Sequence, residues 1–336
     1  MDLWSSIWLA IVAFGAAVTN GAVGYGFSSI ITPIAIFWYS NKVLNPALVL
    51  VEVAVNIALL LRERQHIRAT WPRARPVVTT LFPGVVLGTL GLTFIAVTDV
   101  KLLVYATLLP LVALQLLGFS RPIANERRGG QAIGSGIGFL YSLTTISGPP
   151  LALFLRNQGL SKGQFRCTIA QIRVAESTLT LGTYLAFDQF LGTKYYTAPS
   201  LGLLPALFIA VIIGVPLGTL LLRSVSPDFF RSVVMSLDGI LVSYGLSQVF
   251  VALKWVASQV SYYVFAALLA VVLCLSWYSL RRTSVREPGG GPPLGPGVHA
   301  PPTPPLPRSL SSSETRWHSD NPAAGDPSRV PPTGPA

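Results

Sequence analysis

The chain has 336 residues, of which 51% are hydrophobic and only 11% are charged, and its mean hydropathy is +0.58. So little charge does not cover a soluble surface, and most of the chain is therefore predicted to face lipid. The net charge of +11 does not indicate nucleic-acid binding, because the basic residues lie in short loops beside apolar segments, where they set membrane orientation.

Apolar segments long enough for a bilayer follow one another along the chain. A membrane helix needs about 20 apolar residues. The predicted segments are 4–38, 44–61, 77–97, 101–119, 131–155, 167–187, 199–222, 229–252 and 261–280. The first lacks the basic region of a secretory signal, so we predict a mature membrane helix there. The predicted fold is an all-α membrane protein.

An internal repeat divides the apolar part into two halves. Gly84–Leu90 reads GVVLGTL and Gly214–Leu220 reads GVPLGTL, and each copy lies in the third apolar segment of its half. The predicted organisation is a first repeat at 1–119, a basic cytoplasmic linker at 120–130, a second repeat at 131–252, an extra transmembrane helix at 253–282 and a disordered Pro/Gly-rich tail at 283–336.

Each half opens with a broken apolar segment. The first reads NGAVGYGFSSIITP at 20–33, and the second reads GSGIGFLYSLTTISGPP at 134–150. Glycine permits backbone that a helix forbids, and proline removes a hydrogen-bond donor. Non-helical backbone at membrane depth is tolerated where it is buried in protein or lines a cavity, so two matched breaks predict a binding site between the halves. Glycine-rich packing faces are the alternative interpretation.

The distribution of basic residues predicts the topology. If each broken segment returns to its own side, sixteen basic residues lie inside: Arg62, Arg64, Arg68, Arg73, Arg75, Arg121, Arg127, Arg128, Arg156, Lys162, Arg166, Arg223, Arg231, Arg281, Arg282 and Arg286. The four outside are Lys42, Lys101, Lys194 and Lys254. This arrangement has a cytoplasmic C-terminal tail and two inverted repeats, each a broken or re-entrant hairpin followed by three transmembrane helices. Inverted repeats with broken helices are typical of secondary transporters.

These features resemble the sulfite exporter TauE/SafE family over about residues 4–280. The residues that carry the resemblance are Gly21, Gly24 and Gly26 ahead of Pro33, and Ser147, Gly148 and Pro149 in the second half. GYGFSS and TTISGPP stand here in place of the fuller glycine runs usual in the family. The resemblance implies transport of sulfite, sulfonates or related organosulfur anions across a bacterial inner membrane.

The breaks themselves also favour an anion. Half-helices beginning near Ser28 or Ser29, and near Pro149 or Pro150, would present N–H groups and positive dipole ends. Arg173 adds a planar fork of donors that fits two oxygens, although a structural pair with Glu176 one turn away is an equal alternative. The predicted anion-binding residues are Gly24, Gly26, Ser28, Ser29, Thr144, Thr145, Ser147, Gly148 and Arg173.

Three carboxyl groups inside apolar segments are candidates for proton coupling. Ionisable residues within a membrane usually face a cavity or a partner. Glu52 lies in the second segment, Glu176 in the sixth and Asp238 in the eighth. Arg173 stabilises the ionised form of Glu176, so Glu52 and Asp238, with no basic partner evident in the sequence, are the preferred proton carriers. Structural hydrogen bonding is the alternative for each.

Other functional classes find little support. Cys167 and Cys274 cannot build a metal site, and His66, His299 and His318 lie in a loop and the tail, so no cofactor is expected. The sequence holds no GxxxxGK[ST], HExxH or GxSxG motif, so an enzyme is not expected. An anion channel, a transporter of another small solute and a membrane scaffold acting through the tail stay open as alternatives. The predicted partners are a small anion and the lipid bilayer.

Overall fold

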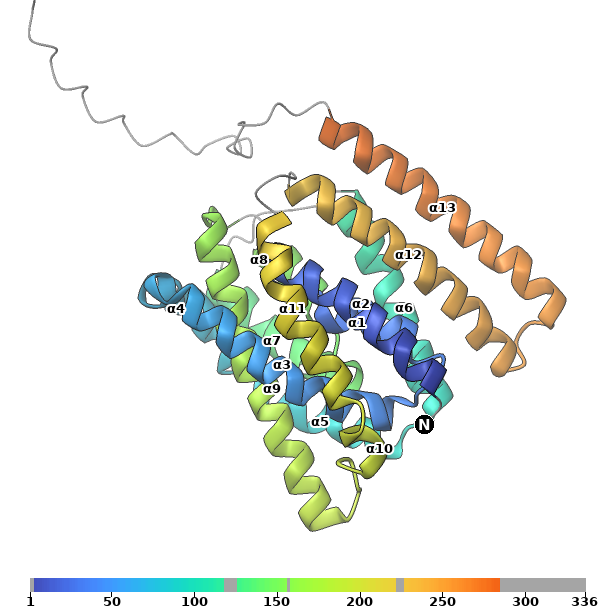
Figure 1. The fold of residues 1–336 in the computed structure, drawn as a ribbon, viewed down its shortest axis with the longest axis horizontal. Coiled ribbons are helices and arrows are strands. Elements are labelled where there is room, and N and C mark those ends of the chain that lie inside the picture. The colour runs from blue at the N-terminus through green and yellow to red at the C-terminus, as the bar shows by residue number, and fades with distance from the viewer. Residues whose placement is uncertain (1–2, 118–125, 156–157, 222–226, 285–336) are drawn as a thin grey trace, which may run out of the picture. The chain divides into compact units, whose positions relative to one another are not determined.

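The structure is a computed structural model that describes residues 3–117, 126–155, 158–221 and 227–284. Every regular element in those ranges is a helix (Figure 1). The elements are α1 (Leu3–Val23), α2 (Phe27–Ala35), α3 (Asn41–Arg62), a 3-10 turn (Arg64–His66), α4 (Ile67–Val78), α5 (Leu81–Phe94), α6 (Val97–Leu116), α7 (Glu126–Thr144), α8 (Gly148–Leu155), α9 (Lys162–Leu191), α10 (Ala198–Leu201), α11 (Leu204–Leu221), α12 (Pro227–Ala252) and α13 (Ser258–Ser284). They belong to one unit, Met1–Pro288. The tail prediction concerns residues that lie almost entirely outside the described ranges.

Each of the nine predicted apolar segments contains at least one helix in the described ranges, but fewer helices meet the length and apolarity that a membrane crossing requires. Six do so, at Ser6–Val23, Asn41–Arg62, Val97–Leu116, Ala198–Leu220, Met235–Ala252 and Ser258–Arg281. The α4–α5 pair, bent by 50°, makes a seventh if it is counted as one span. Helix α9 is 30 residues long but falls outside this set, and it carries Arg166, Arg173, Glu176 and Asp188.

Helix α4 lies where the sequence predicted a basic loop. It forms despite Pro72 and Pro76 inside it. The residues on its buried face include Thr70, Ala74 and Val77, and the helix packs against α7 and α9. The Thr70 hydroxyl donates to the Gln171 side chain of α9, with 3.1 Å between the oxygens. Tertiary packing therefore overrides the poor helix propensity of this segment.

The two halves of the chain pack against each other in matched pairs. Helix α1 lies along α11 and α7 lies along α5, while α3 packs against α9 and α6 against α12. The repeated GVxLGTL motif lies at the first two of these contacts: a Cβ atom at Gly84 would overlap the Ser135 carbonyl of α7, and one at Gly218 would overlap the Val18 carbonyl of α1. Small residues let membrane helices approach this closely. The motif glycines are thus packing residues.

Lysines gather at one end of the helix bundle, which we call the Lys101 end. The Lys101 ammonium donates to the Ile36 carbonyl just after α2, at 2.5 Å. Beside it, Lys42 at the start of α3 donates to the Thr93 carbonyl at 3.0 Å, and the Thr93 hydroxyl contacts the Tyr195 hydroxyl. The chain therefore reaches this end after α2.

Arginines gather at the opposite end of α3, which we call the Arg166 end. Arg62, the last residue of α3, donates to the Thr219 hydroxyl of α11 at 3.3 Å, and Arg166 lies 3.7 Å from the carboxylate of Glu63. Arg166 also donates to the carbonyl of Gly21, near the end of α1, at 3.3 Å. Helices α1 and α2 therefore run in opposite directions along the bundle.

Candidate functional site

The first break separates α1 from α2 and is built from left-handed glycines. Gly24 has φ 91° and Gly26 has φ 108°, a region that other residues rarely adopt. A Cβ atom at Gly24 would also lie 3.0 Å from the Cγ atom of Arg166. The first hydrogen bond of α2 runs from the Ile30 N–H to the Gly26 carbonyl, at 3.1 Å. The N–H groups that begin α2 therefore come directly after the break.

The second break separates α7 from α8 and has a different composition. Thr145 adopts the left-handed φ of 61°, which is uncommon for a residue other than glycine. Helix α8 then begins with Gly148, Pro149 and Pro150. Neither proline has an N–H, and the Leu151 N–H donates to the Ser147 carbonyl at 3.1 Å. The two prolines therefore supply none of the N–H groups that a half-helix near Pro149 or Pro150 is expected to present.

The two breaks lie against each other. The Ser28 hydroxyl of α2 donates to the Thr145 carbonyl at 2.5 Å, and the hydroxyls of Thr32 and Thr145 are 2.9 Å apart. Asn45 of α3 donates from its amide to the Leu143 carbonyl at 2.8 Å. All of these side chains are buried. Residues more than 90 positions apart in the sequence therefore form one polar cluster.

A buried ion pair joins the two halves next to this cluster. Arg173 of α9 and Glu52 of α3 are each only 1% exposed, and 2.5 Å separates Nη2 from Oε1. The Tyr141 hydroxyl of α7 donates to the second oxygen of Glu52 at 2.6 Å. The expectation that Glu52 lacks a basic partner is wrong, and the partner of Arg173 is Glu52 and not Glu176. The reason is that α3 packs against α9, a contact between distant segments.

Glu176 contacts the same cluster from the other side. One oxygen of its carboxyl group accepts a hydrogen bond from the Ser147 hydroxyl at 2.6 Å. The other oxygen has no hydrogen-bond partner among the described residues, and neither do Nε and Nη1 of Arg173. Nη1 would lie 3.2 Å from a Cβ atom at Gly148, so the guanidinium group faces the start of α8.

The remaining predicted residues take different places. Ser29 and Thr144 are buried beside the breaks, and the Ser29 hydroxyl has no partner in the described chain. Asp238 is buried in α12, where both of its carboxyl oxygens also lack a described partner. A Cβ atom at Gly239, the next residue, would contact Val112 and Val272, so apolar residues of α6 and α13 lie nearby. No hydrogen bond between described residues joins Asp238 to the polar cluster.

The sequence analysis missed Tyr141, Thr32 and Asn45, which complete the cluster. Each is a polar residue inside an apolar segment. Tyr141 is fully buried, and a buried tyrosine hydroxyl usually finds a hydrogen-bond partner. That rule offered a signal for Tyr141, whereas nothing in the sequence pointed to its partner.

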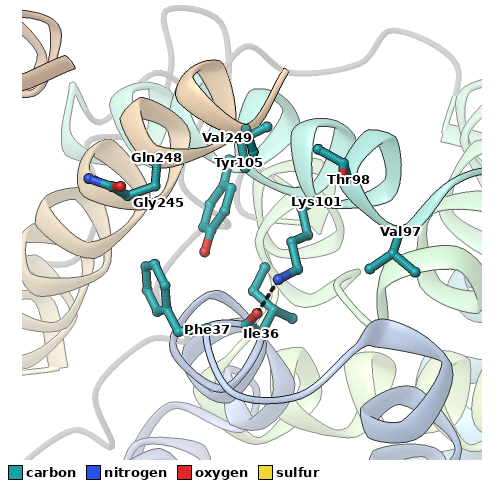
Figure 2. A pocket seen from close by; sticks show the side chains of 10 residues that line it. Ile36, Phe37, Val97, Thr98, Lys101, Tyr105, Gly245, Gln248 and Val249 are labelled. Atoms are coloured by element: carbon teal, nitrogen blue, oxygen red, sulfur yellow. Dashed lines mark hydrogen bonds between the residues drawn. The ribbon is translucent and has the colours of Figure 1, made fainter. Parts of the chain in front are cut away.

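A separate recess of about 210 Å³ lies where α2 ends, between α6 and α12 (Figure 2). Two side chains of α6 line it and bind carbonyls of the α2 segment: Tyr105 donates to Pro33 at 2.9 Å, and Lys101 donates to Ile36. A Cβ atom at Gly245 of α12 would overlap the Tyr105 ring. The recess residues therefore hold the C-terminal end of α2, whereas the Ser28 contact with Thr145 lies at its N-terminal end.

The comparison with known families identifies the chain. A family model described as sulfite exporter TauE/SafE matches residues 9–245. The chain belongs to the sulfite exporter TauE/SafE family. Members of this family are membrane transporters, and the match covers both breaks, Glu52 and Arg173. No curated protein and no solved structure matches the chain. The resemblance predicted from the sequence is confirmed, and the chain is a multi-pass membrane transporter.

Proposed function

We propose that the chain is a secondary transporter of sulfite, a sulfonate or a related organosulfur anion, and that it works by alternating access around the two broken helices. The observation that carries the proposal is Arg173, a fully buried guanidinium group with two nitrogen atoms that have no acceptor among the described residues. Buried polar atoms are normally hydrogen-bonded. A guanidinium edge fits two oxygens of a sulfite or sulfonate group.

The surrounding groups suit the same ligand. The N-terminal turn of α2 adds backbone N–H groups, and the hydroxyls of Ser28, Ser29 and Thr145 add adjustable donors. We assign Gly24 and Gly26 to the first turn and Thr144, Ser147 and Gly148 to the second. These roles follow from position beside the breaks.

Proton coupling completes the proposed function. The candidate groups are Glu52, Glu176 and Asp238, and together with Arg173 they are the charged side chains that are buried in the described chain. Glu52 and Glu176 lie at the polar cluster, whereas Asp238 lies among apolar residues. A carboxyl group that exchanges a proton beside the anion couples the two directly, so we favour Glu52 and Glu176.

The packing pattern supports two inverted repeats. The contact of α1 with α11 has its counterpart in the contact of α7 with α5, and the second glycine of the repeated motif lies at each one: Gly88 against the Phe139 carbonyl and Gly218 against the Val18 carbonyl. Lys42 and Lys101 lie at one end of the bundle, whereas Arg62 and Arg166 lie at the other. The positive-inside rule therefore favours a cytoplasmic Arg166 end in a bacterial inner membrane, with the tail also cytoplasmic.

Flux into proteoliposomes tests the transport proposal. We expect saturable uptake of sulfite by the wild type and none by Arg173→Gln. Arg173→Lys keeps the charge and loses the fork of donors, so it should weaken apparent affinity by about 1.5–3 kcal/mol. Arg127→Gln, at an exposed position of α7, is the matched control and should transport normally. Normal affinity in a folded Arg173→Gln variant would leave this arginine a packing role, and flux that does not saturate would indicate a channel.

Cysteine labelling tests the topology. Because Cys274 is exposed, single cysteines are introduced into a Cys274→Ser background. An impermeant thiol reagent added outside should label a cysteine at Lys42 or Lys254 and should not label one at Arg68, Arg127 or Lys162. Labelling at Lys162 together with Lys42 would mean that the repeats are parallel.

A further inference from the structure

Glu52 already holds the position on Arg173 that an anion would need. Its carboxylate takes Nη2 of the guanidinium group, and its second oxygen accepts from Tyr141. Nη2 carries two N–H groups, so an anion that binds Nη1 and Nη2 together shares Nη2 with Glu52, and the two negative groups repel each other unless Glu52 gives up its contact. Glu52 and the anion therefore compete for Arg173.

The charges of the buried cluster determine when the anion can replace Glu52 on Arg173. The titratable groups that face Glu52 are Arg173 and Glu176 from α9 and Tyr141 from α7. If the anion took Arg173 while Glu52 stayed ionised, a carboxylate would lose its cation inside a site that excludes water. Breaking a buried ion pair in this way is strongly unfavourable, and a buried carboxyl group becomes neutral instead.

We propose that Glu52 is a built-in competitor of the transported anion, which binds Arg173 only after Glu52 has taken up a proton. This inference rests on the proposed function and adds the order of events. The proton adds to a carboxylate oxygen of Glu52, the contact between Nη2 and Oε1 breaks, and the guanidinium donors turn to the anion. No covalent bond to the anion forms or breaks. One negative charge therefore enters the cluster with one proton.

Tyr141 acts as a positioning residue in this exchange. Its hydroxyl lies 2.6 Å from Glu52 Oε2, on the oxygen that Arg173 does not use. A phenol both donates and accepts hydrogen bonds, so it holds the carboxylate before proton uptake and the carboxylic acid afterwards. Glu52 therefore keeps its place on α3 while Arg173 is released.

The pH dependence of anion affinity tests the proposal. Methanesulfonate is the probe, because its charge does not change across a pH series, and its affinity is measured by inhibition of sulfite exchange in proteoliposomes. Sulfite exchange itself establishes that the protein is active. For the wild type, coupling to one proton makes the apparent affinity fall about tenfold per pH unit on the alkaline side.

The Glu52→Gln variant should bind methanesulfonate with the same affinity at every pH. Glu176, one turn from Arg173, is the buried acid that remains beside the guanidinium group in this variant. A pH gradient should no longer drive accumulation of the anion. Glu63→Gln removes a carboxylate at the Arg166 end and is the matched control, for which the wild-type slope is expected. Tyr141→Phe should keep the slope but move its midpoint to higher pH, because the phenol no longer stabilises the carboxylate.

The outcomes separate this inference from the proposed function. A wild-type slope in Glu52→Gln would overturn the inference while leaving anion transport intact. Methanesulfonate that does not inhibit exchange at any pH would also overturn it, because the proposed competition requires a sulfonate to bind Arg173. A wild type that moves no anion would overturn the proposed function itself.

Discussion

The two broken helices make similar turns with different chemistry. At the first break, Gly24 and Gly26 adopt left-handed backbone, and α2 follows with ordinary N–H groups. At the second break, Thr145 adopts the left-handed conformation, and two prolines remove donors from the start of α8. Arg173 lies beside that donor-poor start. In the proposed anion site, the first half would therefore supply backbone donors and the second half a cationic side chain.

Helix α3, after the first broken segment, and helix α9, after the second, also start alike and differ in the side chains that they carry. Ser40 precedes α3 and Ser161 precedes α9, both in extended backbone at the N-cap. Glu52 and Arg173 each come twelve residues after that serine, and they bind each other. The same distance from the N-cap therefore carries an acid in one helix and a cation in the other. The comparison teaches that two helices with similar starts can place opposite charges against each other at the centre of the bundle.

Changes to the ion pair of Glu52 and Arg173 are expected to have the largest effect on stability. Arg173→Gln leaves Glu52 without its cation, so the free energy of unfolding should fall by about 3–5 kcal/mol at neutral pH. The double variant Glu52→Arg, Arg173→Glu restores opposite charges and should recover part of the loss.

Thermal unfolding in detergent measures both variants, and Arg127→Gln serves again as the exposed control. A double variant that is no more stable than Arg173→Gln would mean that the two positions are not interchangeable. The equivalence of α3 and α9 would then be limited to the backbone.

The packing glycines provide the second test, with a smaller effect. Gly88→Ala and Gly218→Ala, at matching positions of the repeated motif, place a methyl group against a backbone carbonyl of the opposite half. Overpacking of this kind costs about 1–3 kcal/mol, and we expect similar losses at the two positions. Gly136→Ala and Gly182→Ala are the controls, because no heavy atom lies within 4 Å of a Cβ atom there. They should be neutral or stabilising by up to about 1 kcal/mol. Unequal losses at Gly88 and Gly218 would argue against matched halves.

The sequence predicted the components of the site better than their partners. Charged residues are costly in an apolar segment, so Glu52, Arg173, Glu176 and Asp238 stood out, and all four are buried. Glycine and proline likewise identified both breaks. Periodicity shows which face of a helix is apolar but not which helix lies against it. The pairing of Glu52 with Arg173 therefore required the structure.

Helix α4 shows the same limit. Its local sequence, with two prolines and three arginines, reads as a loop. Its buried face is completed by α7 and α9, which come later in the chain. Local propensity is a weak guide where distant segments supply the packing.

The smallest expected effect concerns the strained residue of the second break. Thr145→Ala keeps the left-handed backbone and loses the hydroxyl contact with Thr32, so the free energy of unfolding should fall by about 1 kcal/mol. Thr145→Gly loses the same contact but relieves the left-handed strain, which offsets part of the loss, because glycine adopts positive φ without a steric penalty. The glycine variant should therefore be the more stable of the two in thermal unfolding. Both variants keep the Thr145 carbonyl that accepts the hydrogen bond of the Ser28 hydroxyl, so this bond does not contribute to the difference between them. A glycine variant that is less stable than the alanine variant would show that the second break, unlike the first, does not depend on tolerance of left-handed backbone.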